Sequence, residues 1–377
     1  MSRLLITGAR APAALEIARN LHQHGHVVFA ADSLRFPLAA NSRAVSAYHM
    51  IPAPRDGITA YTQALLEIIQ REHIDYLIPT CEEIFYIAFI RETLNPYCHV
   101  CCGDFDLLSR LHSKLEVLDL CNALPVQIPA TRVIEDISMM TDRALANRVV
   151  KSEFCRFGTG VLLHPTNRQL RQLHHHRHGR LLWQQKLTGN EYCSYAIAVN
   201  GEVFAETIYR PRHRLTSAAG IYFEPVMHPG ISKFIAAFCR YYKFEGQVGF
   251  DLMVIEDQVY LLECNPRCTS GVHLLTDVDL FAAFTGTRKT EAVPRPAMLT
   301  LPMLLIGLPV ALKKLRLRQW YRDFRRARDA IQQKGDKPFL LFSLLALGEL
   351  VVKAWRLRLS LRQASTMDIE WDGEAIR

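Results

Sequence analysis

Hydrophobic and polar positions alternate over the N-terminal part of the chain in a pattern that predicts parallel strands joined by helices. The apolar run Leu4–Thr7 has the length of a strand, and Ala13–His24 repeats its apolar positions with a helical period. Val27–Ala31 is a second apolar run of strand length, which completes a β-α-β opening. Tyr61–Glu72 and Tyr76–Pro79 continue the alternation as a helix and a strand. The pattern predicts a doubly wound α/β sheet, whose ligands usually lie at the carboxyl ends of its strands.

Acidic residues follow two of these predicted strands. Asp32 comes directly after the second strand, and Glu82 and Glu83 come shortly after the last one. A dinucleotide-binding fold is the rival interpretation of such an opening. However, the first turn, Gly8–Ala14, lacks the second and third glycines of the pyrophosphate-binding fingerprint. The pattern therefore disfavours a nicotinamide enzyme.

From about residue 111 the pattern changes to a mixture of helices and strands with antiparallel neighbours. The spacing predicts helices over Leu111–Leu120 and Gly230–Tyr242. Strand-like segments in the same region are Arg148–Lys151, Leu181–Gln185, Ser194–Val199, Val203–Ile208, Val248–Ile255 and Val259–Glu263. Pro294 and Pro296 mark a boundary, beyond which the chain is expected to be helical. The predicted fold class is therefore α/β followed by α+β, with a helical C-terminal region.

The most informative pattern is a long hairpin that carries two carboxylates. A strand that begins near Val248 is predicted to turn at Glu256–Asp257 and to return as far as Glu263. Side chains near the open ends of such a hairpin lie close together, so Asp251 is expected near Glu263, with Asn265 on the same face by the two-residue period. Carboxylate and amide oxygens suit Mg²⁺ held between phosphates. The alternative interpretation is a surface hairpin with ordinary charges.

Two further segments carry groups that suit phosphates. Arg267 follows the hairpin and can stabilise a transferring phosphoryl group or an anionic intermediate. The strand that ends at Lys151 is followed by a turn, Ser152–Gly160, that contains Gly158 as a second glycine. Backbone N–H groups in such a turn can bind phosphate oxygens while the lysine neutralises their charge. The segment is not a P-loop, which requires Gly-x-x-x-x-Gly-Lys-Ser/Thr.

The strand Leu181–Gln185 runs into a polar linker with features of a nucleoside-binding segment. Backbone groups of the linker, Gln185–Leu187, can pair with an adenine edge, and the carboxylate of Glu191 can bind ribose hydroxyls. Taken by itself, the segment is equally consistent with a plain strand end.

Taken together and in this order, these elements resemble the ATP-grasp superfamily, in its carbamoyl-phosphate-synthase-like and carboxylate–amine ligase branch. The resemblance covers roughly residues 3–285, and Glu263-x-Asn265-Pro266-Arg267 is its most specific motif. It implies a parallel-sheet pre-ATP-grasp domain over residues 1–110. A two-lobed ATP-grasp domain is implied over 111–290, with the phosphate loop in 111–190 and the metal site in 191–290. The remaining residues, 291–377, form the helical C-terminal region.

The resemblance also implies how a nucleotide is held. Lys114 and Lys151 are similar to the first and second phosphate-binding lysines of the family, and the turn after Lys151 is similar to the loop that covers the phosphates. The implied ATP-binding residues are Lys114, Lys151, Gly158, Thr159, Gly160, Gln185, Lys186, Leu187 and Glu191. Gln185 stands where the family often has Glu, although its amide oxygen can still accept from adenine. Ser152 stands where proline is usual.

For the chemistry, the resemblance implies a ligase that uses ATP and two Mg²⁺ ions. Asp251, Glu263 and Asn265 are the implied metal ligands, and Arg267 and Lys151 the implied catalytic residues at the reacting phosphate. Family members form an acyl phosphate from ATP and a carboxylate, and a nucleophile then displaces phosphate. The implied partners are thus a small-molecule carboxylate and an amine. The alternatives are a carbamoyl-phosphate- or biotin-carboxylase-like enzyme, and a non-catalytic ATP-binding scaffold at a membrane surface.

Two polar segments are candidates for substrate contacts. Arg210 and Arg212 follow a predicted strand, where they either bind an anionic substrate or belong to a solvated basic loop. Glu82 and Glu83 either receive an ammonium group or begin a helix.

Composition restricts the class of protein further. The chain has 377 residues, 49% hydrophobic and 22% charged, which suits two or three packed domains. Its ten cysteines follow no repeating frame, which favours reduced thiols in a cytoplasm. Two cysteine groups, Cys98 with Cys101 and Cys102, and Cys264 with Cys268, lack a second matching pair of ligands, so buried thiols are favoured over metal sites. The histidines His174–His176 and His178 are more consistent with a solvated basic turn than with a metal site.

The net charge of +8 is concentrated in the C-terminal region. Basic residues recur from Lys313 to Arg328, against Asp323 alone. Two apolar runs, Leu299–Leu312 and Phe339–Val352, flank this segment, and each is shorter than the ~20 residues that cross a bilayer. The region is therefore expected either to cap the core or to contact a membrane surface through residues 297–355.

No feature of the sequence predicts a nucleic-acid partner, and the expected location is the cytoplasm, with or without membrane association. The acidic finish, Asp368–Glu374, is expected to fold back near the basic segment or to remain loose.

Overall fold

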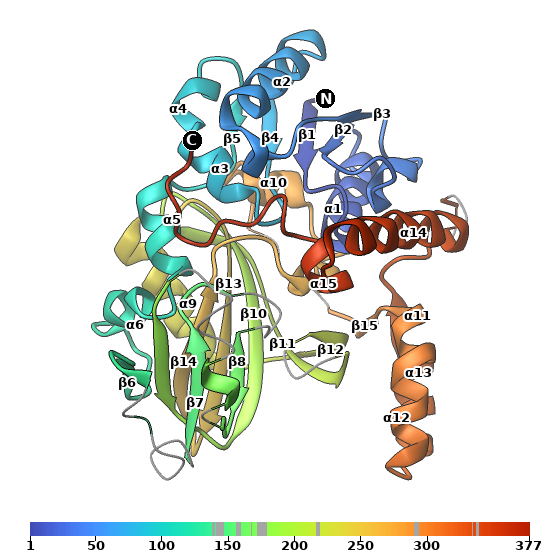
Figure 1. The fold of residues 1–377 in the computed structure, drawn as a ribbon. Coiled ribbons are helices and arrows are strands. Elements are labelled where there is room, and N and C mark those ends of the chain that lie inside the picture. The colour runs from blue at the N-terminus through green and yellow to red at the C-terminus, as the bar shows by residue number, and fades with distance from the viewer. Residues whose placement is uncertain are drawn as a thin grey trace.

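The described part of the chain contains three β-sheets, which follow one another along the sequence (Figure 1). The structure is a computed structural model, and it describes the chain apart from residues 138–139, 141–146, 156–159, 167, 172–178, 216–218, 290–293, 334 and 337–338. The first sheet is parallel and the other two are mainly antiparallel. The predicted order, α/β and then α+β, is confirmed.

The N-terminal sheet is parallel and is covered on both faces. Its strands are β1 (Arg3–Thr7), β2 (Val27–Asp32), β3 (Ala47–Met50), β4 (Tyr76–Ile78) and β5 (His99–Val100), in the order β3-β2-β1-β4-β5. The helices are α1 (Pro12–Gln23), α2 (Ile58–Arg71), α3 (Ile84–Phe89) and α4 (Arg91–Leu94), with short 3₁₀ turns at η1 (Leu38–Asn41) and η2 (Pro54–Asp56). Leu5 packs with α2 and α3, whereas Leu4 and Ile6 pack with α1. Because both faces of β1 are covered, its apolar positions form a continuous run.

The second sheet has the order β6-β9-β7-β8 and is antiparallel. Its strands are β6 (Thr131–Val133), β7 (Arg148–Ser152), β8 (Val161–Leu163) and β9 (Leu181–Gln185). Two short helices, α5 (Phe105–His112) and α6 (Glu116–Cys121), precede it. The single helix predicted over Leu111–Leu120 is therefore wrong. The chain is extended at Ser113, which separates the two helices. The Ser113 hydroxyl donates to Glu153 and accepts the N–H of Glu116, so these side-chain bonds take the place of helical backbone bonds at the break.

The third sheet has the order β14-β13-β10-β11-β12-β15-β16 and is antiparallel except for its last pair. Its strands are β10 (Asn190–Val199), β11 (Glu202–Arg214), β12 (Gly220–Val226), β13 (Gly246–Ile255), β14 (Gln258–Asn265), β15 (Ala297–Met298) and β16 (Arg328–Asp329). Helix α9 (Pro229–Tyr242) packs Phe234 and Phe238 onto Phe250 of β13. A 3₁₀ turn, η4 (Ser270–Leu274), and α10 (Leu280–Phe284) follow the sheet. Strand β11 is longer than predicted and includes both Arg210 and Arg212, so a basic loop at this position is excluded.

The C-terminal region is helical, as predicted. It contains α11 (Thr300–Pro302), the π-helix η5 (Met303–Gly307), α12 (Leu308–Lys313), α13 (Leu317–Arg326), α14 (Phe339–Leu357) and α15 (Leu361–Ala364). Figure 1 shows η5, α12 and α13 as an arm that projects away from the sheets. Trp320 holds the helices of this arm together, since its Nε1 donates to the carbonyl of Met303 at 3.2 Å. None of the described helices is both long enough and apolar enough to cross a membrane.

The last residues of the chain pack against the N-terminal sheet. Arg10 forms ion pairs with both Asp32 and Asp368, at 2.5 and 2.7 Å. Trp371 is only 6% exposed, and its ring lies between Phe105 and the ring of Phe154, which follows β7. Both predicted alternatives for Asp368–Glu374 are therefore wrong. These residues are bound by Arg10 and by aromatic side chains, and they lie away from the basic segment Lys313–Arg328.

The ten cysteines are free thiols. Cys98, Cys101, Cys102, Cys264 and Cys268 are buried, and burial raises the pKa of each. Within the residues that the structure describes, no group of three or more His, Cys, Asp or Glu side chains is placed to hold a metal ion. His174–His176 and His178 lie outside the described residues.

Candidate active site

The β13–β14 hairpin brings its two carboxylates into contact. Asp251 and Glu263 are cross-strand partners, and their carboxyl groups share a hydrogen bond. A β-bulge follows, because Leu252 pairs with Leu261 and leaves Leu262 as the extra residue of β14. The hairpin pattern predicted this approach of the two acidic groups.

Two lysines from separate elements approach the end of β14 that carries Glu263. Lys114 lies in the break between α5 and α6, and its Nζ lies 3.4 Å from Glu263 Oε2. The same Nζ donates to the carbonyl of Cys155 at 2.8 Å. Lys151 of β7 donates its Nζ to the carbonyl of the bulged Leu262 at 3.4 Å. Both lysine side chains are less than one tenth exposed, whereas 26% of the Glu263 side chain remains accessible.

Burial and neighbouring charges set the protonation of this carboxylate–lysine cluster. Burial and the charge of Glu263 raise the pKa of Asp251 to about 7. Burial would also raise the pKa of Glu263, but Lys114 and Lys151 reverse this effect and lower the pKa well below its ordinary value. Burial lowers the pKa of Lys151, while in Lys114 the interactions with Cys155 and Glu263 outweigh burial and raise the pKa. Two carboxyl groups in contact, one with a raised pKa and the other with a lowered pKa, are an arrangement that suits either a shared proton or a cation.

Arg267 links the end of the hairpin to the N-terminal sheet. Its Nε donates to Glu82 Oε1 at 2.7 Å, and its Nη2 donates to Asn265 Oδ1 at 3.1 Å. Glu82 is 3% exposed, so this ion pair is largely shielded from solvent. A second link comes from Gln247 of β13, whose Nε2 donates to the carbonyl of Pro79 at 2.8 Å. The two contacts hold the amide of Asn265 against the strand end of β4.

Glu83 differs from Glu82 in its surroundings. Its Oε1 accepts from Thr7 Oγ1 at 2.8 Å and from the backbone N–H groups of Thr80 and Cys81, both at 3.1 Å. These bonds join the carboxyl ends of β1 and β4 at the start of α3, and burial raises the pKa of Glu83. Of the two predicted alternatives, Glu83 fits the beginning of a helix, and Glu82 lies beside the cluster.

The predicted adenine-binding linker lies along the same strand ladder as Lys151. Lys151 pairs with Leu182 and Arg148 pairs with Gln185, which places the linker three residues, or roughly 10 Å, from the lysine. Gln185 and Lys186 are exposed. The N–H of Gln185 is bound by a neighbouring loop carbonyl, and Leu187, which follows, is half-buried.

The described ends of the predicted phosphate loop are held together by a backbone bond. The N–H of Ser152 donates to the carbonyl of Gly160 at 2.8 Å. A Cβ at Gly160 would lie 2.8 Å from that of Cys155, so a larger residue would require the loop to shift. Gly158 and Thr159 lie outside the described residues.

Two groups beside the cluster were not predicted from the sequence. Glu153 accepts from Ser113 Oγ at 2.6 Å and from Arg180 Nη2 at 2.7 Å, which fixes the α5–α6 break next to β7. The other is the backbone carbonyl of Cys155, which binds Lys114. Every residue has a backbone carbonyl, so the role of Cys155 could not be predicted from residue type. Glu153 could have been identified as an acidic residue directly after a buried strand.

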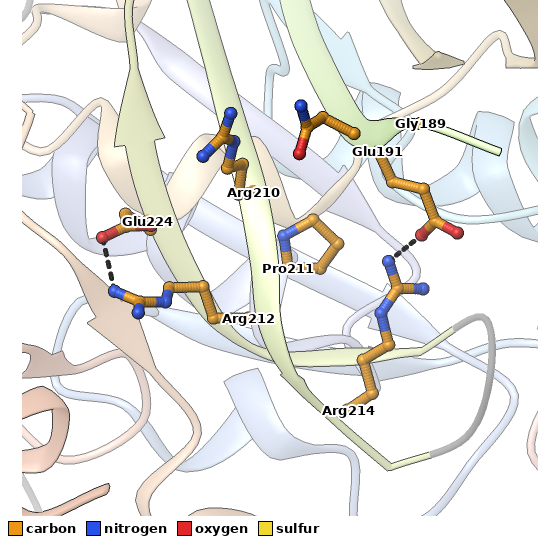
Figure 2. A pocket seen from close by; sticks show the side chains of 8 residues that line it. Gly189, Glu191, Arg210, Pro211, Arg212, Arg214 and Glu224 are labelled. Carbon is orange, nitrogen blue, oxygen red and sulfur yellow. Dashed lines mark hydrogen bonds and ion pairs between the residues drawn. The ribbon is translucent and has the colours of Figure 1, made fainter. Parts of the chain in front are cut away.

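A pocket of about 560 Å³ lies along β10, β11 and β12 (Figure 2). Its lining residues are Gly189, Asn190, Glu191, Arg210, Pro211, Arg212, Arg214 and Glu224. Figure 2 shows Arg212 paired with Glu224 and Arg214 paired with Glu191. Arg210 instead lies over the ring of Tyr192 and donates to its hydroxyl, and its buried Nε has no hydrogen-bond partner among the described residues.

Glu191 connects this pocket to the cluster. It lies two residues before Cys193, the cross-strand partner of Asp251, so Glu191 and Asp251 share one face of the sheet. The Asp251–Glu263 pair itself does not line the pocket. The pocket is thus a neighbour of the carboxylate–lysine cluster along the same sheet.

The sequence matches no known family model and none of the curated proteins. The fold, in contrast, is similar to several solved structures. N5-carboxyaminoimidazole synthetase from Staphylococcus aureus complexed with ADP has a TM-score of 0.62 at 14% identity, over 83% of this chain and 86% of that chain. L-amino acid ligase from Bacillus licheniformis has a TM-score of 0.60 at 13% identity, over 78% of each chain.

The biotin carboxylase domain of the Hydrogenobacter thermophilus 2-oxoglutarate carboxylase, in complex with MgADP and bicarbonate, has a TM-score of 0.58 at 12% identity, over 76% of this chain and 70% of that chain. The chain has the ATP-grasp fold. Within this ATP-grasp fold, the cluster lies where the four-stranded sheet meets the seven-stranded sheet, since Lys151 belongs to one and Glu263 to the other.

Proposed function

We propose that the protein is an ATP-dependent ligase, which converts a carboxylate into an acyl phosphate and joins it to an amine with release of ADP and phosphate. The observation that carries this proposal is the convergence of Lys114 and Lys151 on the Asp251–Glu263 pair. Lysines neutralise a polyphosphate, and paired carboxylates hold the metal ions that accompany it. The fold shared with an L-amino acid ligase and an ADP-bound synthetase supports the same conclusion.

The nucleotide would extend along the β7–β9 ladder. The adenine would contact the linker Gln185–Leu187, and the phosphates would lie roughly 10 Å away near Lys151 and Lys114. The turn 152–160, including Gly158, Thr159 and Gly160, would cover the phosphates. Glu191 would bind the ribose after exchange of its exposed ion pair with Arg214.

In domain terms, we propose residues 1–110 as the pre-ATP-grasp domain and 111–290 as the ATP-grasp domain. Its lobes, 111–190 and 191–290, would close on the nucleotide, and 291–377 would form the C-terminal region.

Mg²⁺ would be held by Asp251, Glu263 and Asn265. Their oxygens suit a hard cation, and the contact between the two carboxyl groups favours a positive charge or a proton between them, which supports this assignment. Because the described residues supply two carboxylates and one amide here, phosphate oxygens would complete the coordination of the two ions. When bound, the metal neutralises charge on the transferring phosphoryl group.

The reaction proceeds by two displacements. An oxygen of the substrate carboxylate attacks the γ-phosphorus of ATP, the bond to the β-phosphate oxygen breaks, and ADP leaves. Lys151 and Arg267 stabilise the charge on the transferring group. The amine nitrogen then attacks the acyl carbon, phosphate leaves, and the amine loses a proton. Positioning of the reactants supplies much of the rate enhancement, so no protein nucleophile is required.

Of the two candidate arginines for the substrate carboxylate, Arg210 has the freer side chain, although its contact with Tyr192 places it on the face of the sheet opposite Glu191 and Asp251. It has an aromatic support and a buried Nε that no described residue binds, whereas Arg212 is already paired with Glu224 and lies near Asp323. Glu82 is the better candidate for the amine, because it lies beside Arg267, whereas Glu83 is already hydrogen-bonded at the carboxyl ends of β1 and β4.

The test is ADP release with a panel of carboxylates and amines, with hydroxylamine added to trap the acyl phosphate as a hydroxamate. We expect Lys151→Ala and Glu263→Gln each to lower turnover by roughly 100- to 1000-fold, because each removes a charge from the transferring group or its metal. Lys233→Ala on α9 and Glu256→Gln at the hairpin turn are matched controls, since both residues are exposed and lie away from the cluster.

Full turnover in Lys151→Ala or Glu263→Gln would refute the assignment of the site. ADP binding by the wild-type chain without turnover on any acid–amine pair would favour an ATP-binding scaffold. ADP release that depends on bicarbonate would favour a biotin-carboxylase-like or carbamoyl-phosphate reaction.

A further inference from the structure

Helix α14 turns its polar residues toward the protein. Glu349 accepts the backbone N–H groups of Arg35 and Phe36, both at 2.8 Å. One turn later, Lys353 forms an ion pair with Asp368 at 2.9 Å. The charged side of this helix is therefore used to attach it to the N-terminal domain and the C-terminal tail.

The opposite face of α14 is apolar and exposed. Trp355 is 79% exposed, and Leu344 is 53% exposed. These two residues lie with Leu347 and Val351 at helical spacing, so they form one stripe along the helix. The exposed apolar residues of α14 are Leu344, Leu345, Leu347, Val351, Val352, Trp355 and Leu357. A helix at a protein surface usually has the reverse arrangement, and an exposed apolar stripe of this kind marks an interaction surface.

The arm formed by η5, α12 and α13 adds a second exposed apolar surface, beside basic residues. In Figure 1 the arm and α14 both lie at the edge of the molecule away from α4, α5 and α6. Exposed apolar residues of the arm are Leu304, Leu305, Val310, Leu312, Leu315, Leu317 and Tyr321. Exposed basic residues of the arm are Lys313, Lys314, Arg316, Arg318, Arg322, Arg325 and Arg326. These cations form no salt bridge with any residue that the structure describes.

We infer that α14 and the arm together form a docking surface for a membrane that contains anionic lipids. Apolar side chains of both elements enter the boundary between headgroups and acyl chains, and the exposed cations of the arm bind the headgroups. Trp355 and Tyr321 are aromatic residues next to arginines, a combination typical of the membrane interface. In this arrangement both elements lie along the membrane surface.

Charge distinguishes this occupant from a second copy of the chain. The chain carries a net charge of +8, so two copies that met through their basic arms would repel each other. An anionic bilayer supplies both the apolar phase and the opposite charge. The inference does not depend on the proposed ligase activity, because the docking surface and the carboxylate–lysine cluster share no residue.

The test is flotation of the full chain with vesicles of phosphatidylcholine alone or of phosphatidylcholine with roughly 30% phosphatidylglycerol. We expect roughly tenfold more protein to float with the anionic vesicles, and less at high salt, because several cations contribute to binding. Trp355→Glu combined with Val351→Glu should abolish flotation. Tyr241→Glu is the matched control, because Tyr241 is an exposed aromatic residue, 65% accessible, on α9.

Trp355 also offers a direct spectroscopic readout. Trp320 and Trp371 are buried and Trp183 is half-buried, so a blue shift of emission on addition of anionic vesicles should come from Trp355. Trp355→Phe should keep flotation and lose the shift, and this conservative variant leaves the fold undisturbed.

Equal flotation of the wild type and the Val351→Glu, Trp355→Glu variant would overturn the inference. It would also be overturned if the wild type failed to float with anionic vesicles and sedimented as a dimer that the same variant converted to a monomer. That result would assign the surface to a second copy.

Discussion

The carboxylate–lysine cluster and the outer face of α14 depart in opposite directions from the usual partition of side chains. In the cluster, the charged groups of Lys114 and Lys151 are held in the interior, close to the Asp251–Glu263 pair. On α14, large apolar groups such as Trp355 and Val351 face solvent. Folding alone favours neither arrangement, because burial of charge and exposure of apolar surface both cost free energy.

This contrast suggests a way to distinguish residues that bind a ligand from residues that stabilise the fold. Residues that serve the fold should destabilise the protein when they are removed. Residues that serve a ligand should be neutral or even stabilising to replace, while function is lost. Three substitutions, ordered from the largest expected effect to the smallest, test this distinction.

The first substitution compares two tryptophans of the C-terminal region. Trp371 packs against Phe85, Phe105 and Phe154, so Trp371→Ala should lower the free energy of unfolding by about 3–5 kcal/mol. Trp355→Ala should change it by less than about 0.5 kcal/mol, because this side chain is already exposed. Urea unfolding of both variants measures the difference. Equal losses would show that α14 packs its outer face within the chain, which would break the comparison.

The second substitution probes a buried charge that serves the fold. Burial would raise the pKa of Asp368, but Arg10 and Ser33 hold it well below its ordinary value of 3.8. Asp368→Asn should therefore lower the free energy of unfolding by about 2 kcal/mol at pH 7. Because the depressed pKa stabilises the fold only while the carboxyl is ionised, the gap to the wild type should shrink as the pH falls below about 4. A gap that is independent of pH would contradict the ion pair.

The third substitution probes Asp251, a half-buried carboxyl group that we propose as a metal ligand. The folded chain holds the proton of Asp251 up to about pH 7, whereas the unfolded chain releases it near 3.8. This residue thus lowers the free energy of unfolding as the pH rises between these values. Asp251→Asn should raise the free energy of unfolding by about 1 kcal/mol at pH 8 and by less at pH 5, and it should abolish ADP release. If Asp251→Asn instead lowered the free energy of unfolding at pH 8, Asp251 would be a structural residue, like Asp368. Asp257→Asn, at the exposed turn of the same hairpin, is the matched control.

Local patterns were sufficient for much of the fold and part of the candidate site. The β-α-β opening of the N-terminal domain and the strands β7, β9, β10, β11, β13 and β14 follow from periodicities that each segment carries by itself. The remaining strands of the two antiparallel sheets, β6, β8, β12, β15 and β16, were not predicted. The approach of Asp251 to Glu263 followed from one hairpin, in which register is a short-range property. The position of Lys151 at the end of strand β7 also followed from a local pattern, whereas its approach to the β13–β14 hairpin required two sheets to pack together.

Other features depended on contacts between distant parts of the chain. The break that presents Lys114 exists because Ser113 bonds to Glu153, and the partner of Arg267 comes from the N-terminal sheet. Asp368 reaches Arg10 across 358 positions. No local period encodes such pairs, because their free energy appears only when separate elements pack.

What the amino-acid sequence determined by itself was the order of the sheets and the acidic hairpin, since backbone periodicity and turn chemistry act over a few residues. The tertiary structure decided where the tail binds, which side of α14 faces solvent and which lysine completes the cluster. These outcomes depend on burial, and a side chain becomes buried only through the elements that the fold brings against it.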